Sequence, residues 1–471
     1  MAGQKYNIGM IGLGVMGRNL VLNMADHGFS VAGYDLDPAK VNALRSEAGD
    51  RPVKGAASHP EFFGLLRAPR TVMMLVPAGA PVDSVIRAAL PHLEPDDLLV
   101  DAGNSHFKDT ERRAEYLAER HIHYLGVGIS GGESGARTGP SIMPGGSRPA
   151  YERVRAIFEA VAAKVDGEAC VTYLGPGSSG HYVKMVHNGI EYGLMRLIAD
   201  AYDFMKRGLG LSNDDLGDTF DAWKGGEIAA YLIEITAKIF RRRDEQTGSR
   251  LIDLILDEAE QEGTGKWTSQ DAMDLYVPIP TIDAAVSARD LSVMKKDREN
   301  ASSALGGEIG RFSGNRDECL DQIRKALYAS MLITYSQGLS LLRAASSARG
   351  YFLNLGDIVR IWRGGCIIRA ALLEKIRTAL RRRPDLAHLL LDPVLGEEVK
   401  SRIQDFRAAV CTAAGLGIPV PGFMASLSYY DGLRSARLPA NLIQAQRDFF
   451  GSHTYKRTDI PGIFHTRWDD R

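Results

Sequence analysis

The chain of 471 residues is long enough for two or more domains, since a domain typically holds about 150 residues. Its content of 45% hydrophobic and 24% charged residues excludes disordered, collagenous and coiled-coil proteins. Fifty-seven basic residues against 58 acidic ones leave a net charge of −1, so no global field attracts nucleic acid or an anionic membrane.

Cysteine spacing and apolar runs indicate the compartment. The four cysteines lie far apart with no C-x-x-C pair, which excludes a disulfide scaffold or a zinc ribbon and is typical of a reducing cytosol. The most apolar run, residues 71–82, contains Pro77 and Pro81 and is far too short to span a membrane. The N-terminus carries no cleavable apolar segment. We therefore expect a cytoplasmic protein with no nucleic-acid and no membrane partner.

Short β-rich runs alternate with amphipathic helical runs up to about residue 177. The expected strands are Asn7–Ile11, Ser30–Tyr34, Thr71–Val76, Leu98–Asp101, His123–Gly128 and Val171–Leu174. The expected helices between them are Met16–His27, Ala39–Glu47, Pro81–Leu93 and Lys108–Arg120. This alternation predicts βαβ units and a doubly wound parallel sheet, that is, an α/β Rossmann-like dinucleotide-binding domain over residues 1–177.

The pattern changes to helical periodicity from His181 to about Arg437. The long helical runs are Lys184–Gly208, Ile228–Arg243, Asp317–Ser347 and Ala370–Arg382. We expect a large all-α domain over residues 178–437, followed by an extended C-terminal tail over residues 438–471 with little periodicity. The tail is rich in aromatic residues that need a surface to pack against, and a partner subunit would provide one.

A glycine-rich turn follows the first expected strand and opens a helix. Its G-x-G-x-x-G motif consists of Gly12, Leu13, Gly14, Val15, Met16 and Gly17. Gly12 permits the tight turn, Gly14 lets the backbone approach a pyrophosphate, and Gly17 lets helix and strand pack closely. The helix N-terminus supplies free N–H groups for the phosphates. These features predict a dinucleotide site; the alternative is a glycine-rich turn that binds nothing.

Asp35 ends the second expected strand and indicates which dinucleotide binds. A carboxylate at this position accepts hydrogen bonds from the ribose hydroxyls of NAD and repels the additional phosphate of NADP. Leu36 and Asp37 follow, so no arginine is present there, and Lys40 is the only nearby cation. The alternative is that Asp35 merely begins the turn into the next helix.

A polar stripe begins just after the domain boundary. Lys184, His187, Asn188 and Glu191 are spaced i, i+3, i+4 and i+7, which puts them on one helix face. An amine, an imidazole, an amide and a carboxylate together at a cleft predict catalysis, although a surface helix also shows a polar stripe. From the residues alone His187 is the favoured base, because the ordinary pKa of imidazole lies near neutrality.

The chain resembles the long dimeric form of the decarboxylating 6-phosphogluconate dehydrogenase family nearly end to end. The glycine turn and the polar stripe belong to this resemblance, and so do the strings that begin at Asp101, Ser130, Ser141, Glu262, Trp362 and Gln444. The resemblance implies that 6-phosphogluconate loses a hydride from carbon 3 to NAD or NADP. The resulting 3-keto acid then loses its carboxylate as CO2. Protonation of the remaining enediol, at the atom that becomes carbon 1 of the product, gives ribulose 5-phosphate, a reaction of the pentose phosphate pathway.

The resemblance also implies the site residues. It makes Lys184 the general base, overruling His187, and Glu191 the general acid, so the pKa of Lys184 must fall and that of Glu191 must rise. It implies no metal. It places Val76 and Asn104 with Leu13, Asp35 and the glycine turn at the cofactor. The implied substrate ligands are Asn104, Ser130, Gly131, Gly132, His187 and Asn188 around the sugar acid, Tyr192, Lys266, Thr268 and Arg289 at the phosphate, and Arg447 and His453 from the neighbouring subunit of a homodimer.

One position departs from the family pattern. Most members carry Asn-Arg-Thr after the second strand, and the arginine holds the NADP phosphate; this chain has Asp35-Leu36-Asp37. We therefore expect NAD to be preferred, with NADP as the second choice. Two other functions stay open from the residues. One is a β-hydroxyacid dehydrogenase acting on a smaller acid, which would not need Lys266, Arg289 and Arg447; the other is a catalytically silent NAD(P)-binding sensor.

Overall fold

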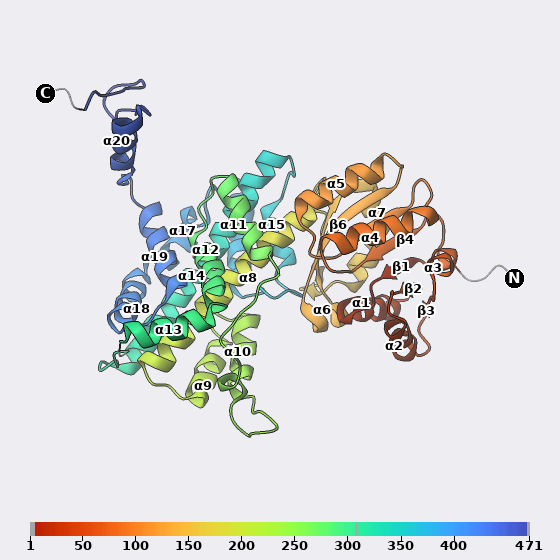
Figure 1. Cartoon of the computed structure of the whole chain (residues 1–471), viewed down its shortest axis with the longest axis horizontal. Coiled ribbons are helices and arrows are strands. Elements are labelled where there is room, and N and C mark those ends of the chain that lie inside the picture. The colour runs from red at the N-terminus through yellow and green to blue at the C-terminus, as the bar shows by residue number, and fades with distance from the viewer. Residues whose placement is uncertain (1–4, 308, 469–471) are drawn as a thin grey trace.

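Seven strands form one twisted sheet in the N-terminal domain (Figure 1). The computed structural model describes residues 5–307 and 309–468, so the ends of the predicted first domain and tail lie outside the described residues. The strands are β1 (Ile8–Ile11), β2 (Val31–Tyr34), β3 (Val53–Gly55), β4 (Thr71–Met74), β5 (Leu98–Asp101), β6 (His123–Ser130) and β7 (Ser141–Gly146). Their order is β3-β2-β1-β4-β5-β6-β7, and only β7 is antiparallel to its neighbour.

Helices cover both faces of this sheet. They are α1 (Val15–Asp26), α2 (Pro38–Ala48), α3 (His59–Leu65), α4 (Ala80–Ala89), α5 (Phe107–Ala118), α6 (Gly132–Thr138) and α7 (Arg148–Val161). Alternate side chains of each buried strand join two separate cores: Leu98 and Val100 pack with α1, α2 and α7, and Leu99 packs with α3, α4 and α5. The predicted Rossmann-like domain is confirmed, with an antiparallel edge strand added.

The rest of the chain is helical. Its helices are α8 (Ser179–Asp203), α9 (Asn213–Trp223), α10 (Tyr231–Arg241), α11 (Thr264–Asp274), α12 (Pro280–Ser292), α13 (Lys295–Leu305), α14 (Arg316–Arg349), α15 (Leu355–Ile361), α16 (Leu372–Arg382), α17 (Pro393–Lys400), α18 (Ile403–Gly415), α19 (Pro421–Leu433) and α20 (Ala440–Gly451). The long helix α14 is largely buried and packs against α8, α18 and α19, which makes it the centre of this domain. Within the described ranges, no helix combines the length and the apolarity that crossing a bilayer requires.

Two expectations about local structure are wrong. Residues 171–174 do not form a strand: Val171 makes a single bridge to Ile142, and the Leu174 N–H donates to the Pro144 carbonyl oxygen of β7. The carbonyl groups of Ala169 and Val171 accept hydrogen bonds from the Arg360 guanidinium. The tail is not aperiodic, since its first part forms α20. The sequence pattern also missed β3 and β7.

The start of α8 lies directly against the sheet. A Cβ atom on Gly180 would fall 2.2 Å from the carbonyl oxygen of Gly126 on β6 and 2.5 Å from the backbone nitrogen of Gly145 on β7. Backbone therefore meets backbone here, and no side chain fits between them. This contact fixes the polar stripe of α8 beside the carboxyl end of β6.

Candidate active site

The glycine turn between β1 and α1 has the geometry that the motif predicts. Gly12 has a φ of +97°, and a Cβ atom there would lie 2.3 Å from the Leu75 carbonyl oxygen. A Cβ atom on Gly17 would lie 1.9 Å from the Gly12 carbonyl oxygen, so this position also requires glycine. Gly14 caps α1 and has no atom within 4 Å of its Cβ position, which leaves the backbone open to a ligand.

Two adjoining cavities form a groove at this turn. The groove lies where the strand order reverses: the connection from β1 leads to β2 on one side, and the connection from β4 leads to β5 on the other. Their volumes are about 550 and 620 Å³, and Gly14, Leu75, Val76 and Pro77 line both. The first cavity is also lined by Asp35 and Leu36, and the second by Asn104. A groove of this length beside an open glycine backbone fits a dinucleotide, and the predicted cofactor residues Val15, Met16, Val76 and Asn104 all lie along it.

Asp35 is held in place by the backbone around it. Its carboxylate accepts hydrogen bonds from the N–H groups of Leu13 at 2.7 Å and of Asp37 at 2.9 Å. The Lys40 ammonium lies 3.8 Å away, and Leu36 projects into solvent with 82% of its surface exposed. A fixed carboxylate at the end of β2 therefore faces the first cavity, with a lysine beside it and no arginine among the cavity's lining residues.

The polar stripe of α8 is buried, unlike the stripe of a surface helix. Lys184, His187 and Asn188 are buried, and the Glu191 side chain is 22% exposed. His187 Nε2 lies 3.2 Å from Ser130 Oγ, and its Nδ1 lies 3.1 Å from Asn188 Oδ1 and 3.8 Å from Glu191 Oε2. The structure thus brings the four stripe residues and Ser130 of β6 into one cluster.

The burial of the stripe shifts its pKa values. Burial lowers the pKa of the Lys184 ammonium, and the nearby Glu191 carboxylate opposes this shift. Burial raises the pKa of Glu191, against the pull of Lys184 and Arg289. The pKa of His187 falls well below its ordinary value, first through burial and then through the charge of Lys184. The amine and the carboxyl therefore have the shift directions that a base and an acid working near neutral pH require.

The loop after β6 lies against the segment that follows α15. Gly131 has a φ of +129°, and a Cβ atom there would lie 2.6 Å from the Gly365 carbonyl oxygen. The Ile367 N–H donates to Ser130 Oγ at 3.4 Å, and the Trp362 ring packs edge-on against His187. Gly132 follows with a φ of +61° and open space at its Cβ position. The predicted substrate residues 130–132 thus lie beside the stripe.

The residues expected at the phosphate differ in their accessibility to a ligand. The Arg289 guanidinium stacks 3.6 Å above the Tyr192 ring, and Lys266 is exposed on α11. Thr268 is fully buried, and its hydroxyl lies 2.9 Å from the carbonyl oxygens of both Met185 and Thr264. In this structure the Thr268 side chain therefore holds α11 against α8.

Arg447 and His453 do not reach this cluster within one chain. Both are exposed on or just beyond α20, which projects from the helical domain on the side away from the N-terminal sheet (Figure 1). The tail is held together by the buried Asp448, whose carboxylate accepts hydrogen bonds from the Thr454 and Thr466 N–H groups and from the Trp468 indole. The tail is therefore an ordered unit that extends away from its own domain.

Glu262 is a residue that the sequence reasoning left without a role. It lines the second cavity of the groove, and its charge acts on the pKa of Lys184, so it lies between the groove and the stripe. Its place in the glycine-rich string 262–266 was the only signal. Among residues 5–307 and 309–468, no three His, Cys, Asp or Glu side chains gather closely enough to hold a metal ion.

Comparison with known proteins identifies the family. Residues 7–175 match the NAD binding domain of 6-phosphogluconate dehydrogenase, and residues 180–468 match the C-terminal domain of the same enzyme. The chain is 52% identical over 98% of its length to the NADP(+)-dependent, decarboxylating 6-phosphogluconate dehydrogenase of Bacillus subtilis, 99% of which is covered. It is 50% identical over 99% of its length to the decarboxylating enzyme of Synechococcus elongatus, all of which is covered.

A solved structure supports the same assignment. The structure of Plasmodium falciparum 6-phosphogluconate dehydrogenase, described in its apo form and in complexes with NADP+ and with 6-phosphogluconate, is 44% identical to this chain. It superposes with a TM-score of 0.95 and covers 98% of this chain and 100% of that one. The glycine turn, the amine and the carboxyl on one face of α8 and these matches along the whole length lead to one conclusion: the chain belongs to the family of decarboxylating 6-phosphogluconate dehydrogenases, which are oxidoreductases.

Proposed function

We propose that this chain oxidises 6-phosphogluconate to ribulose 5-phosphate and CO2. One observation carries the proposal: the buried Lys184 and the partly buried Glu191 lie on one face of α8, close to a groove that fits a dinucleotide. Gly14, Asp35, Val76 and Asn104 would hold NAD or NADP, which, when bound, accepts the hydride from carbon 3 of the substrate.

The two stripe residues divide the proton transfers between them. With its lowered pKa, Lys184 is the group that takes the proton from the carbon-3 hydroxyl during oxidation. The product of this step is a β-keto acid, so the bond to the carboxylate breaks into an adjacent carbonyl. With its raised pKa, Glu191 is the group that delivers a proton to carbon 1 of the enediol that remains.

The remaining polar groups suit the two ends of the substrate. Ser130, His187 and Asn188 form a hydrogen-bonded set beside Lys184 and would bind the carboxylate and the hydroxyl groups. Arg289 and Lys266 supply the positive charge that a phosphate group requires. An acid without a phosphate group would leave these two cations without a partner, which favours the phosphorylated substrate.

We also infer a preference for NAD over NADP. In the first cavity the additional phosphate of NADP would meet the fixed Asp35 carboxylate, and the exposed Leu36 has no donor to offer it. Lys40 is the only cation among the lining residues and already lies 3.8 Å from Asp35. The Bacillus subtilis relative is named as NADP(+)-dependent, so this preference would set the present chain apart from it.

We further propose a homodimer in which the tails are exchanged. Leu442, Ile443, Phe449 and Phe450 expose more than half of their surfaces on α20. Apolar surface of this extent on a projecting helix is typical of a subunit interface. Exchange would bring Arg447 and His453 of each tail to the other subunit, which accounts for their distance from the cluster of their own chain.

Steady-state kinetics test these proposals together. Purified protein is assayed with 6-phosphogluconate and either cofactor, following CO2 release as well as reduced nicotinamide. We expect turnover with both cofactors and a higher kcat/KM with NAD; replacing Asp35-Leu36 by Asn-Arg should reverse the ratio. Lys184→Ala should abolish turnover and still bind NAD. Reduction without CO2 release, or near-normal turnover of Lys184→Ala, would contradict the proposed reaction, and an unchanged ratio would contradict the cofactor argument.

A further inference from the structure

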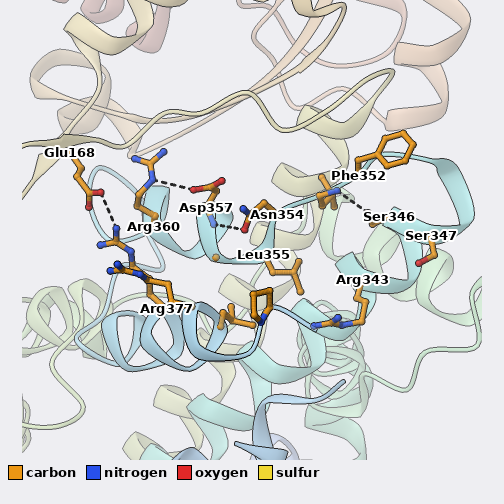
Figure 2. Close-up of a pocket in the computed structure, with 15 residues that line it drawn as sticks. Glu168, Arg343, Ser346, Ser347, Phe352, Asn354, Leu355, Asp357, Arg360 and Arg377 are labelled. Carbon is orange, nitrogen blue, oxygen red and sulfur yellow. Dashed lines mark hydrogen bonds and ion pairs between the residues drawn. The ribbon is translucent and has the colours of Figure 1, made fainter. Parts of the chain in front are cut away.

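A cavity of about 760 Å³ opens between the C-terminal end of α14, α15 and α16, with Glu168 of the short strand β9 (Glu168–Ala169) at one side (Figure 2). Its volume lies in the range of small-molecule sites, which is roughly 300–1,000 Å³. It shares no lining residue with either cavity of the cofactor groove. The catalytic cluster described above does not use it.

The charge of this cavity is positive. Four arginines and two carboxylates line it: Arg343, Arg360, Arg377 and Arg381 against Glu168 and Asp357. Figure 2 shows Arg377 paired with Glu168 and Arg360 pointing toward Asp357. The nitrogen–oxygen distances of these two pairs are 2.9 Å and 3.7 Å.

The other two arginines are not neutralised in this way. Arg343 donates to the carbonyl oxygen of Leu386, a neutral acceptor. Throughout the described part of the chain, no carboxylate lies within 4 Å of the guanidinium group of Arg343 or Arg381. Two positive groups therefore line the cavity without compensating charge, and guanidinium groups bind phosphate groups through paired N–H donors.

An aromatic side chain stands on the rim of the same cavity. Phe352 is 84% exposed, although the neighbouring Tyr351 is buried. Its φ of +56° is rare for a bulky residue and costs free energy that the surrounding fold must offset. A hydrogen bond from the Leu353 N–H to Ser346 Oγ, at 2.9 Å, holds this loop in place (Figure 2). The ring is thus presented to solvent by an ordered backbone, as a surface on which a flat base can stack.

We propose that this cavity is a second ligand site and that it binds a nucleoside polyphosphate. The phosphates would lie between Arg343 and Arg381, and the base would stack on Phe352. The combination is specific: guanidinium groups alone would accept any small polyanion, and the exposed ring alone would accept any apolar group. The site is independent of the proposed activity, because binding to it requires no turnover.

Equilibrium dialysis with ATP and the full-length protein tests the proposal. Saturating 6-phosphogluconate and NADH occupy the active site and the groove without turnover, because NADH cannot accept a hydride. NADH carries far less negative charge than ATP, so it competes weakly at a guanidinium site. We expect ATP to bind under these conditions. Arg381→Ala should weaken this binding by about tenfold, the effect of one charged hydrogen-bond donor. Arg383→Ala is the matched control, because Arg383 is exposed and does not line the cavity.

A second variant separates a nucleotide from a simple polyanion. Phe352→Ala should weaken ATP binding by about fivefold or more, the effect of losing one stacked base, and should leave pyrophosphate binding unchanged. Both variants change exposed side chains, so the fold should persist. The proposal is overturned if ATP does not bind beside NADH, if Arg381→Ala and Arg383→Ala weaken binding equally, or if Phe352→Ala leaves ATP binding unchanged.

Discussion

Gly128 of β6 lies against Lys184, the amine that we propose as the base, and replacing Gly128 by alanine should disable the enzyme without unfolding it. A Cβ atom on Gly128 would lie 2.3 Å from Lys184 Cβ and 2.8 Å from its Cγ. Ordinary contact begins at 3.4 Å, so Lys184 must move from 2.3 Å to at least 3.4 Å, a displacement of about 1.1 Å. Either the Lys184 side chain alone or the start of α8 with it must move away from β6 to relieve this contact. In both cases Lys184 is displaced from the place it occupies beside the strand.

A displacement of this size has a large expected effect on catalysis. Misplacing a reacting group by about 1 Å costs roughly a hundredfold in rate, so kcat of Gly128→Ala should fall by about that factor. The cost in stability should be about 1–3 kcal/mol, the usual effect of overpacking. Steady-state kinetics and a thermal melt measure both. Gly415→Ala on α18 is the matched control, since no atom lies within 4 Å of its Cβ position. A Gly128→Ala enzyme with wild-type kcat would refute the assignment of Lys184 to the chemistry.

Three further predictions follow from the burial and from the tail. The pH profile of kcat/KM should rise as Lys184 loses its proton and fall as Glu191 loses its proton. Burial lowers the pKa of Lys184 and raises that of Glu191, so the two pKa values lie closer together than in free side chains. Glu191→Gln should remove the fall at alkaline pH from the activity that remains. Deleting the residues after Gly451 should abolish turnover and leave NAD binding intact, and a fully active truncated enzyme would exclude tail exchange. Burial raises the pKa of Asp448, but hydrogen bonds from His465 and from two backbone N–H groups outweigh it and lower this pKa to about 2. The Asp448 carboxylate therefore stabilises the tail fully above the ordinary pKa of aspartate, and this stabilisation is lost as the pH falls toward 2. Asp448→Asn should mimic that loss at neutral pH and speed tryptic cleavage within the tail, with an unchanged melting temperature of the main body.

The features that local chemistry determines could be predicted from the sequence. The glycine turn was predictable because Gly12 and Gly17 meet backbone atoms that leave no room for a Cβ atom, and this requirement is visible as a motif. The stripe of α8 was predictable because helical spacing alone aligns its members. Its burial was not, since that depends on β6 and α11, which are remote in the sequence.

Other features depend on contacts that leave no local pattern. Strand β7 contains Pro144 and two glycines and lacks β-branched alternation, yet it pairs with β6 because it lies at the edge of the sheet. The Thr268 hydroxyl contacts a carbonyl oxygen of α8, which its position in the Glu262 string does not reveal. Helix α20 escaped notice because its apolar residues occur as exposed pairs instead of a single buried stripe.

The backbone contact between Gly180 and the strands β6 and β7 has a consequence for engineering. Any side chain at these glycines would push the two domains apart, so only glycine is compatible with this contact. Libraries that aim at new sugar acids should therefore keep these glycines and diversify the tail and the segment around Glu262, where an altered shape would not push Lys184 away from β6.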